Sequence, residues 1–443
     1  MGSRLFLWRV AAPTRSATAM PERDGERMAV SPIDPRPAAT APLSGRHGAV
    51  VVYSYFPEDP RPLREARALV QAGMTLDYVC LTQDPALPRR EHVDGIDVIR
   101  IPLRRRRRGK LTYLWQYLAF LLGAGAVISR RALRRPYDLV HVHNMPDVLV
   151  FTALVARWRG ARVLLDLHDP MPELMETIFG LDPDSRFVRF LRWSERLSLR
   201  FADHAITANE AFRRLFVARS CPERKMSVVV NTPEESVFVP DPGAVELARP
   251  PDRFELMYHG SLVERHGLLT ALEAVARLVP TMPELRFSIY GHPTPFVETI
   301  ETRIAELGLG GVVSYRGARD LSGIAAAVAA CDLGLVPNER TSFTEINLPT
   351  RLFEYLALGK PVIAPDTRGI RDYFGDEDMV YFQPGKAEDL ARTIVWVREH
   401  PDEVAGRVAS GQRVYQAHRW TDERRILLGV VDDLLSSRSG HER

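Results

Sequence analysis

A short predicted helix after Pro349 carries two side chains that could bind phosphate and sugar hydroxyls. Pro349 suits a helix start and Gly359 its end, so Arg351 falls in the first turn and Glu354 lies one turn further along the same face. A cation in the first turn opposes the helix dipole, but it can hold an anion together with the free backbone N–H groups. Glu354 only accepts hydrogen bonds, which suits sugar hydroxyls. The structural alternative is an Arg351–Glu354 ion pair on a solvated helix.

Two histidine-containing segments follow predicted strands and are candidates for reaction chemistry. His168 and Asp169 end one strand, where the imidazole could hydrogen-bond a reacting group and Asp169 could orient it or bind a hydroxyl. The alternative is that Asp169 caps the next helix. His141 and His143 lie at alternate positions of another strand, with no third ligand at useful spacing, so we expect no metal site there. His141 should be buried, while His143 and Asn144 should face a ligand.

A third candidate is the loop that opens the second half of the chain. Gly260 and Ser261 follow a predicted strand, and Arg265 comes four residues later. Glycine lets a ligand approach the backbone closely, and Arg265 could reach a diphosphate. A plain turn with a surface arginine is the alternative. The first strand of neither half is followed by G-x-G-x-x-G, and no Walker motif occurs, so the sequence supports no NAD site and no other cofactor.

The positions of the apolar runs predict an α/β fold with two Rossmann-like domains. Short β-branched runs alternate with helical patterns in both halves, which indicates parallel sheets covered by helices. In the first half the runs are Ala49–Tyr53, Leu76–Leu81, Val98–Ile101, Leu139–His143, Val163–Leu167, His204–Thr207 and Ser227–Val230. In the second half they are Phe254–Tyr258, Leu285–Tyr290, Gly311–Tyr315, Asp332–Val336, Pro361–Ala364 and Met379–Phe382. Ligands of such sheets bind beyond the carboxyl ends of the strands.

Composition divides the chain into five segments. We expect residues 1–46 to be a disordered extension, 47–231 the first domain, 232–252 a proline-rich linker, 253–421 the second domain, and 422–443 a helix that packs back on the first domain, with a tail. Basic and acidic residues nearly balance, at 59 and 56. The three cysteines are scattered singly, which fits a reducing cytoplasm and excludes a disulfide framework.

The segment 103–136 contains ten Lys or Arg and no Asp or Glu. Between its basic flanks lie eighteen uncharged residues, Leu111–Ile128, near the lower length for a membrane span. Both flanks are basic, so neither end prefers the far side of a membrane. An interfacial helix on an anionic membrane surface fits better, and a buried helix beside a solvated arginine loop is the alternative. No nucleic-acid recognition module accompanies the arginines, so we expect no nucleic acid partner.

Taken together, these motifs resemble the family 4 retaining glycosyltransferases, above all bacterial enzymes of exopolysaccharide or lipid-linked glycan assembly. The resemblance covers roughly residues 47–435. It is carried by V-H-V-H-N-M-P-D (140–147), L-D-L-H-D-P-M-P-E-L (165–174), G-S-L-V-E-R-H-G (260–267), I-Y-G-H (289–292) and L-P-T-R-L-F-E-Y-L-A-L-G-K-P-V-I-A (348–364). It implies the GT-B fold, in which two Rossmann-like domains have parallel sheets that face a central cleft.

The resemblance also implies roles for individual residues. Glu354 matches the glutamate that holds the nucleotide ribose, Arg351 and Arg265 match cations at the diphosphate, and His168 matches the histidine near the reacting sugar. The loop of Gly317 and Arg319 matches the loop whose backbone meets the base. The resulting candidate donor-binding residues are Gly260, Ser261, Arg265, Gly317, Arg319, Glu345, Asn347, Leu348, Thr350, Arg351 and Glu354. The catalytic candidates are His168 and Asp169, and the acceptor-side candidates are His143 and Asn144.

Two departures from the family pattern concern the donor sugar. Many members carry two glutamates eight positions apart, but Ile346 stands eight positions before Glu354, with Glu345 one step out of register. The role of the first glutamate is therefore unfilled, or taken by Glu345 or by the backbone N–H groups of Asn347 and Leu348. Where many relatives have lysine before the loop glycine, this chain has His266.

The implied activity is a metal-independent, retaining transfer of a hexose-type sugar from a nucleoside diphosphate to a lipid-linked or polysaccharide acceptor, in cell-surface glycan synthesis. The implied location is cytoplasmic and peripheral, on the inner face of the cell membrane. Alternatives are another enzyme with two Rossmann-like domains, such as a sugar-nucleotide epimerase or a phosphorylase, and a catalytically silent membrane scaffold of the same fold.

Overall fold

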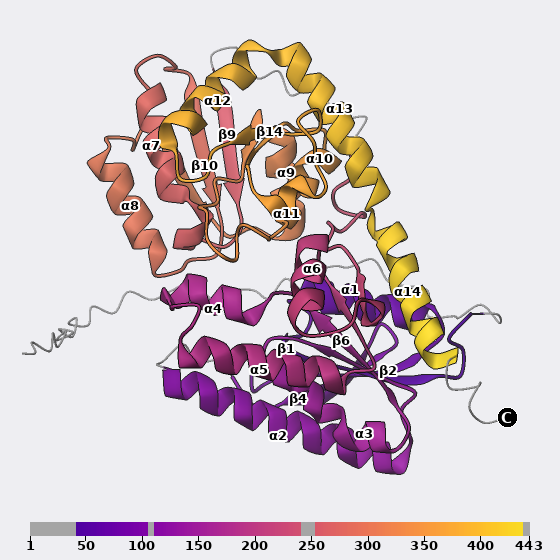
Figure 1. The fold of residues 1–443 in the computed structure, drawn as a ribbon. Coiled ribbons are helices and arrows are strands. Elements are labelled where there is room, and N and C mark those ends of the chain that lie inside the picture. The colour runs from indigo at the N-terminus through magenta and orange to yellow at the C-terminus, as the bar shows by residue number, and fades with distance from the viewer. Residues whose placement is uncertain (1–40, 105–109, 241–252, 437–443) are drawn as a thin grey trace, which may run out of the picture. The chain divides into compact units, whose positions relative to one another are not determined.

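Two open sheets, both dominated by parallel strands, form the framework of the protein (Figure 1). The computed structural model describes residues 41–104, 110–240 and 253–436, and the side chains of all of these except 110–114. The described residues belong to one compact unit. Most of the extension 1–46, the arginines 105–108 and half of the linker 232–252 lie outside the described residues, so those expectations stay predictions.

The first sheet has eight strands in the order β3-β4-β2-β1-β5-β6-β7-β8. All neighbours are parallel except β3 and β4, which form a hairpin whose turn residues Asp94 and Gly95 both have positive φ, as a tight two-residue turn requires. The strands are β1 (His47–Tyr55), β2 (Thr75–Leu81), β3 (Arg90–Val93), β4 (Ile96–Ile101), β5 (Leu139–His143), β6 (Arg162–Leu167), β7 (His204–Thr207) and β8 (Met226–Val228).

Helices cover both faces of this sheet because its strands are apolar on both sides. In β1, Ala49 and Val51 face one buried cluster, while Val50 and Val52 face another, following the two-residue period of a strand. The helical segments are α1 (Pro60–Gln71), α2 (Lys110–Arg134), the 3₁₀ helix η1 (Asp147–Ala153), α3 (Leu154–Trp158), α4 (Met171–Phe179), α5 (Arg186–Phe201), α6 (Glu210–Arg219) and the 3₁₀ helix η2 (Glu223–Lys225).

The second sheet has six parallel strands in the order β11-β10-β9-β12-β13-β14. They are β9 (Phe254–His259), β10 (Leu285–Tyr290), β11 (Val313–Gly317), β12 (Leu333–Leu335), β13 (Val362–Pro365) and β14 (Val380–Phe382). The helical segments are η3 (Glu264–His266), α7 (Leu268–Leu278), α8 (Phe296–Glu306), α9 (Leu321–Ala330), α10 (Thr350–Ala357), α11 (Arg368–Arg371), α12 (Ala387–Glu399), α13 (Pro401–Ala417) and α14 (Trp420–Ser436).

The last helix, α14, packs against elements at the start of the chain. Leu427, Val431 and Leu435 belong to the same buried cluster as residues of α1, β1 and β2. Glu423, also on α14, accepts a hydrogen bond from the backbone N–H of Val230 at 2.7 Å. Figure 1 shows α14 in yellow beside α1.

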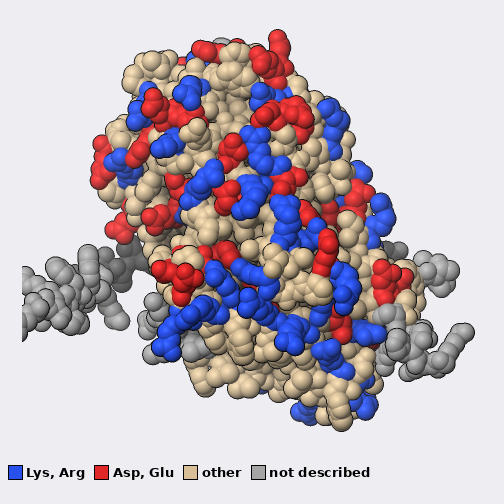
Figure 2. Space-filling view, in the orientation of Figure 1, with Lys and Arg blue, Asp and Glu red and all other residues tan. Residues whose placement is uncertain are grey.

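Helix α2 occupies most of the basic segment that suggested membrane contact. Its side chains from residue 115 on alternate between buried positions, such as Phe120, Ala124 and Ile128, and exposed ones. None of the described helices has an apolar stretch long enough to cross a bilayer. In the space-filling view, Lys and Arg gather in a band over the part of the surface where Figure 1 places α4 and α5 (Figure 2).

Candidate functional site

The helix that carries Arg351 and Glu354 has the ends predicted from the sequence. Pro349 caps α10 in extended conformation, and Gly359 follows its end with a φ of +67°. A positive φ is the conformation that ends helices and favours glycine. Leu352, Phe353, Tyr355 and Leu356 are buried, so Arg351 and Glu354 occupy the remaining face.

Arg351 lies against the loop that follows β9. Its guanidinium carbon is 4.8 Å from the centre of the Tyr258 ring. Gly260 has a φ of +132°, and a Cβ atom there would lie 2.9 Å from Arg351 Nη2. Both the backbone conformation and the close approach of the guanidinium therefore require glycine at this position.

Arg265, on η3, reaches the same region. Burial lowers the pKa of its guanidinium, the Asp169 carboxylate opposes that shift, and the positive charge of Arg351 adds to it. Arg265 Nε and Arg351 Nη1 are buried and have no hydrogen-bond partner within the described parts of the chain. Unpaired buried donors are costly, and two guanidinium groups in one region repel each other. An anion bound between them would satisfy both.

Within the described residues, Glu354 does not form the solvated ion pair with Arg351 that was the alternative prediction from the sequence. Instead, Glu354 Oε2 accepts a hydrogen bond from His259 Nε2, at the end of β9. The Glu354 side chain is 15% exposed. A carboxylate can accept several hydrogen bonds, so the pairing with His259 orients Glu354 and leaves capacity for a ligand hydroxyl.

Two other predicted donor residues, Thr350 and Glu345, have partners inside the protein. Thr350 Oγ1 accepts a hydrogen bond from Asn231 Nδ2 at 2.9 Å, which ties the start of α10 to the chain after β8. Glu345 Oε2 accepts one from Arg340 Nη1 at 2.6 Å. Leu348 is buried and Asn347 half-buried. Their roles at a donor sugar remain predictions.

The loops after β9 and β11 hold the remaining donor candidates. The carbonyl of Ser261 accepts hydrogen bonds from the Tyr258 hydroxyl and from His266 Nδ1, both at 2.8 Å. Burial, then Arg351 and Arg265, hold the pKa of His266 well below its usual range, so it adds no third positive charge at neutral pH. Gly317 ends β11 with a φ of +73°, and Arg319 is exposed.

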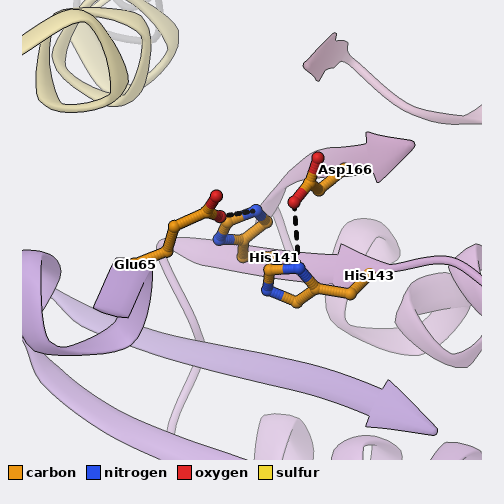
Figure 3. Close-up of side chains that lie close together, drawn as sticks. All are labelled: Glu65, His141, His143 and Asp166. Carbon is orange, nitrogen blue, oxygen red and sulfur yellow. Dashed lines mark hydrogen bonds and ion pairs between the residues drawn. The ribbon is translucent and has the colours of Figure 1, made fainter. Parts of the chain in front are cut away.

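In the first sheet, four buried residues lie close enough to hold a metal ion, which the sequence analysis did not expect. They are Glu65 of α1, His141 and His143 of β5, and Asp166 of β6, with ligand atoms within 4.8 Å of one another (Figure 3). The third and fourth ligands come from distant parts of the sequence, so local spacing could not reveal them. His141 is buried, as predicted.

The arginine beside this cluster supplies the positive charge that a metal ion would bring. Arg61 Nε and Nη2 donate to the two carboxylate oxygens of Asp166, both at 2.9 Å, and Nε lies 3.2 Å from Glu65 Oε1. His143 Nδ1 donates to Asp166 Oδ2 at 3.1 Å. Because both carboxylates already face a guanidinium, the residues fit a buried ion pair better than a divalent cation.

Burial and Arg61 shift the pKa values of the two carboxyl groups of this cluster in opposite directions. Burial, reinforced by the charge of Asp166, raises the pKa of Glu65 to about 8. Burial alone would raise the pKa of Asp166 too, but Arg61 and the neighbouring histidines hold it well below its usual range. The cluster at neutral pH is therefore an ionised Asp166 paired with Arg61, beside a protonated Glu65.

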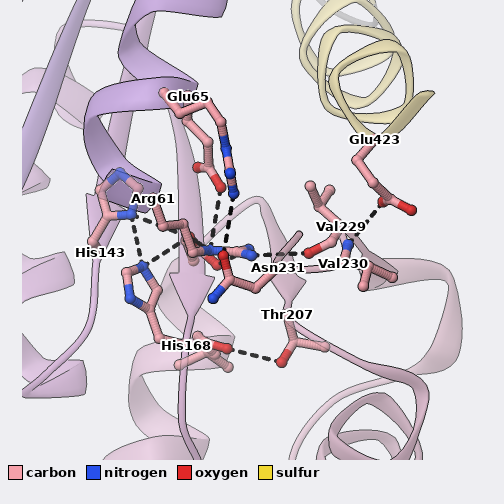
Figure 4. Close-up of polar contacts among 12 residues, drawn as sticks. Arg61, Glu65, His143, His168, Thr207, Val229, Val230, Asn231 and Glu423 are labelled. Carbon is pink, nitrogen blue, oxygen red and sulfur yellow. Dashed lines mark hydrogen bonds and ion pairs between the residues drawn. The ribbon is translucent and has the colours of Figure 1, made fainter. Parts of the chain in front are cut away.

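His168 leads from this cluster to the surface (Figure 4). Its Nε2 donates to Asp166 Oδ2 at 2.9 Å, and its side chain is 21% exposed. Burial disfavours the charged ring, but the Asp166 carboxylate outweighs it and raises the pKa of His168. Because Nε2 faces Asp166, Nδ1 is the ring nitrogen left for a ligand.

The acceptor-side candidates His143 and Asn144 contact the His168–Asp169 segment, and their acceptor role stays a prediction. His143 is fully buried and Asn144 is 5% exposed. His143 Nδ1 lies 3.0 Å from His168 Nε2, and Asn144 Oδ1 accepts a hydrogen bond from the backbone N–H of His168 at 2.8 Å. Asn144 Nδ2 donates to the carbonyl of Asp169 at 2.9 Å. Both residues therefore hold the His168–Asp169 segment in place.

Asp169 connects the two groups of candidates. Burial raises the pKa of its carboxyl, and the positive charges of His168 and Arg265 oppose the shift. Asp169 and Arg265 thus interact electrostatically, although they follow strands of different sheets. The structure brings His168, Asp169, Arg265 and Arg351 into one region.

Sequence reasoning missed Arg61, Glu65 and Asp166. Asp166 carried a usable signal, because a carboxylate inside the apolar strand Arg162–Leu167 needs a buried partner. Arg61 and Glu65 are four residues apart on one helix face, which looks like an ordinary surface pair. A separate cavity of about 280 Å³ near α9 is lined by none of the predicted site residues.

Comparison with known families gives two matches that follow the order of the two sheets. Residues 60–232 match the model of the glycosyl transferase 4-like domain, and residues 253–400 match that of glycosyl transferases group 1. A search of curated protein sequences found no match.

Solved structures share the fold at low sequence identity. Sucrose-phosphate synthase from Thermosynechococcus elongatus has a TM-score of 0.75 at 18% identity and covers 88% of this chain and 100% of its own. Anabaena HepE in complex with UDP-glucose has a TM-score of 0.64 at 17% identity, and the match covers 88% of this chain and 99% of HepE. WaaG, a glycosyltransferase involved in lipopolysaccharide biosynthesis, has a TM-score of 0.63 at 16% identity, and the match covers 87% of this chain and 99% of WaaG.

The two matched regions together span most of the chain, and each contains one of the two parallel-dominated sheets. The structural similarity extends over nearly the whole length of each solved structure. The chain therefore belongs to the glycosyltransferases of GT-B fold, with a glycosyl transferase 4-like domain followed by a group 1 domain.

Proposed function

We propose that this glycosyltransferase binds a nucleoside diphosphate sugar on the second sheet and transfers the sugar with retention to a lipid-linked or polysaccharide acceptor. The observation that carries the proposal is the pair of half-buried arginines, Arg265 and Arg351, whose buried donors Nε and Nη1 have no partner in the described protein. A diphosphate is the anion that suits two arginines beside a glycine loop. The complex of HepE with UDP-glucose supports a donor of this class.

The proposed chemistry needs no metal ion, because the arginines carry the charge of the leaving group. As the bond between the anomeric carbon and the diphosphate oxygen breaks, negative charge develops on that oxygen, and Arg265 and Arg351 stabilise it. The acceptor oxygen bonds to the anomeric carbon on the same face. Its proton passes to the departing diphosphate oxygen, so that atoms and charges balance.

Glu354 and His168 orient the donor in this proposal. Glu354, positioned by His259, accepts hydrogen bonds from the ribose hydroxyls. His168, whose Nε2 is held by Asp166, presents Nδ1 to a hydroxyl of the reacting sugar. Asp169 stands between His168 and Arg265 and is the candidate for contact with the sugar or the acceptor hydroxyl.

A lipid-linked acceptor places the enzyme at the inner face of the cell membrane. The basic segment 103–136 and its helix α2 support that location. WaaG, a solved relative, is involved in lipopolysaccharide biosynthesis, which is consistent with an acceptor of this class.

The proposal is tested by donor hydrolysis with a panel of UDP-, GDP- and ADP-sugars. Arg351→Ala should lower turnover of the active donor by about 10²–10³-fold while thermal stability changes little, because it removes one donor to the developing charge. Arg277→Ala, which changes an exposed arginine of α7, is the matched control and should be neutral. Normal turnover in Arg351→Ala would remove this residue from the site. Absence of both turnover and nucleotide binding in the wild type would favour a catalytically silent scaffold.

A further inference from the structure

Exposed large apolar side chains are concentrated on four consecutive helices. Of the fourteen found among the described residues, twelve lie on α2–α5, and the other two are Val239 and Ile426. Single exposed apolar residues are ordinary, but a concentration of this kind marks an interaction surface. The twelve are Trp115, Leu118, Leu122, Leu133, Leu154, Trp158, Ile178, Phe179, Phe187, Phe190, Trp193 and Leu197.

Helix α5 presents the most regular part of this surface. Phe187, Phe190, Trp193 and Leu197 recur every three or four residues, so they form one stripe along the helix, and they are 50%, 54%, 57% and 39% exposed. The Phe190 and Trp193 rings stack at 5.9 Å. The opposite face of α5 is buried in the protein, so core packing does not explain the aromatic stripe.

Helix α2 presents a second stripe. Trp115, Leu118 and Leu122 are 65%, 43% and 63% exposed on one face, opposite the buried Phe120 and Ala124. Both α2 and α5 pack against η1, so the two stripes flank the same element of the fold. We call the exposed residues of α2 and α5 the aromatic face.

The exposed charged residues of α5 itself are all basic. Helix α5 exposes Arg186, Arg189, Arg196 and Arg200, and its only acidic residue, Glu195, is buried and paired with Arg219. Helix α2 contains no Asp or Glu. Figure 2 shows the band of Lys and Arg bordering an uncharged area where Figure 1 places α5 and α2. The occupant of this face must therefore be apolar and anionic.

We propose that the aromatic face docks on an anionic lipid surface, with Phe, Trp and Leu side chains at the headgroup boundary and the arginines on lipid phosphates. Aromatic residues favour that boundary, and arginines near it attract anionic lipid. A second copy of this chain fits less well, because a two-fold contact would bring the same arginines together. The inference deepens the proposed membrane acceptor and adds α5 to the segment 103–136.

The first test compares binding of the full chain to vesicles of equimolar phosphatidylcholine and phosphatidylglycerol with binding to phosphatidylcholine alone. Phe187→Ser/Phe190→Ser/Trp193→Ser should weaken binding to the anionic vesicles by roughly a hundredfold, because three aromatic side chains that would bury their exposed area in lipid are lost. Val239→Ser/Ile426→Ser, which removes the two exposed large apolar residues that lie outside α2–α5, should bind like the wild type. Equal affinity of the triple variant and the wild type would overturn the proposal.

The second test separates charge from apolar contact. Arg189→Glu/Arg200→Glu should weaken binding at least about tenfold at low salt and much less at high salt, whereas Arg277→Glu should have no effect. The proposal would be contradicted if the affinity of the wild type for vesicles depended neither on lipid charge nor on salt concentration. So would a self-association of the wild type that the triple variant abolishes, since a second copy would then be the occupant.

A third measurement needs no variant. Three of the exposed side chains are tryptophans, namely Trp115, Trp158 and Trp193. Vesicles of the same composition with brominated acyl chains should quench their fluorescence, and the absence of quenching in bound protein would exclude insertion of this face. Hydrolysis of a soluble donor does not require vesicles, so a failure of lipid binding and a failure of the proposed transferase activity are distinguishable.

Discussion

At the scale of single residues, the candidate site depends on charges that the protein leaves incompletely paired. Arg265 and Arg351 are half-buried side chains, each with a buried donor nitrogen that has no partner in the described protein, whereas the fully buried Arg61 is saturated by Asp166, Glu65 and the carbonyl of Val229. The contrast separates two uses of arginine. Arg61 holds the protein together, and the other two are available to an anionic ligand.

Glu354→Gln should weaken nucleotide binding by about tenfold, because a charge-assisted hydrogen bond to the ribose becomes a neutral one. The substitution keeps the size of the side chain, so the fold should be retained. Calorimetric titration with the active nucleoside diphosphate measures the effect, and circular dichroism checks the fold. Unchanged affinity would count against the ribose role.

The buried Glu65 predicts a pH-dependent stability with a definite sign. Its pKa in the folded protein is about 8 against an ordinary 4.5, so its contribution to stability is complete below 4.5 and is lost as the pH rises toward 8. The free energy of unfolding of the wild type minus that of Glu65→Gln should therefore fall by a few kcal/mol, as an order of magnitude, across that range.

Urea unfolding at a series of pH values measures this difference. Glu306→Gln, at an exposed position of α8, is the matched control and should show no such trend. A flat difference for Glu65→Gln would mean that Glu65 does not hold its proton in the folded state.

Local signals in the sequence predicted the backbone around the candidate residues, whereas long-range contacts could not be predicted. The helix ends on either side of Arg351 and Glu354 are confirmed, and a Cβ atom at Gly260 would meet the Arg351 guanidinium. His143 and Asn144 were placed at a strand end and expected to face a ligand. Burial by Asp166 and His168, which come from the next strand, could not be read from local spacing.

At the scale of elements, the site is built from strand ends and one short helix. β9 ends at His259, which holds Glu354 of α10, and the next residue, Gly260, leaves room for Arg351 of the same helix. One strand end therefore positions both candidate side chains of α10. The geometry of the loop after β9 is thus a requirement for the site.

Gly260→Ala should damage both stability and nucleotide binding. Its φ of +132° is unfavourable for alanine, and the added Cβ would meet the Arg351 guanidinium. We expect a loss of about 1–3 kcal/mol in the free energy of unfolding and at least about tenfold weaker nucleotide binding. Gly310→Ala, where a Cβ meets no atom within 4 Å, is the control for thermal melting and calorimetry. Equal behaviour of the two variants would contradict the proposed role of the loop.

Helix α14 should be a structural part of the first half. Leu427→Ala should lower the free energy of unfolding by about 2–5 kcal/mol, because Leu427 is fully buried against α1 and the first sheet. Its neighbour Ile426 is 44% exposed, so Ile426→Ala should change stability by less than about 0.5 kcal/mol. Urea unfolding compares the pair, and similar losses would show that α14 does not pack as described.

Most strands could be predicted because apolar β-branched runs are unambiguous in a parallel sheet covered on both faces. The strand β3 was missed, since Arg90–Val93 is a short edge strand with polar residues. The chain between β5 and β6 differs from one regular α-helix, because it forms the 3₁₀ helix η1 followed by α3. At this point η1 packs against both α2 and α5. Local periodicity in the sequence does not reveal such tertiary packing.

At the scale of the whole molecule, hydrogen bonds of the segment after β8 link the two groups of candidate residues. Arg61 donates to the carbonyl of Val229, Arg64 donates to the carbonyl of Thr232 at 2.6 Å, and Asn231 donates to Thr350 at the start of α10. The buried ion pair beneath His168 and the helix of Arg351 are thereby attached to the same short stretch of chain, of which Figure 4 shows the contact between Arg61 and Val229. Only the folded chain shows this connection, because its members are far apart in sequence.

The most direct test of the account is calorimetric titration of UDP, GDP and ADP into the wild type, Arg265→Ala, Arg351→Ala and the control Arg277→Ala. The account predicts that the wild type and Arg277→Ala bind one of the three nucleotides alike. It also predicts that each of the other variants binds that nucleotide about a hundredfold more weakly. Unchanged affinity in both Arg265→Ala and Arg351→Ala, or no binding of any of the three to the wild type, would contradict it.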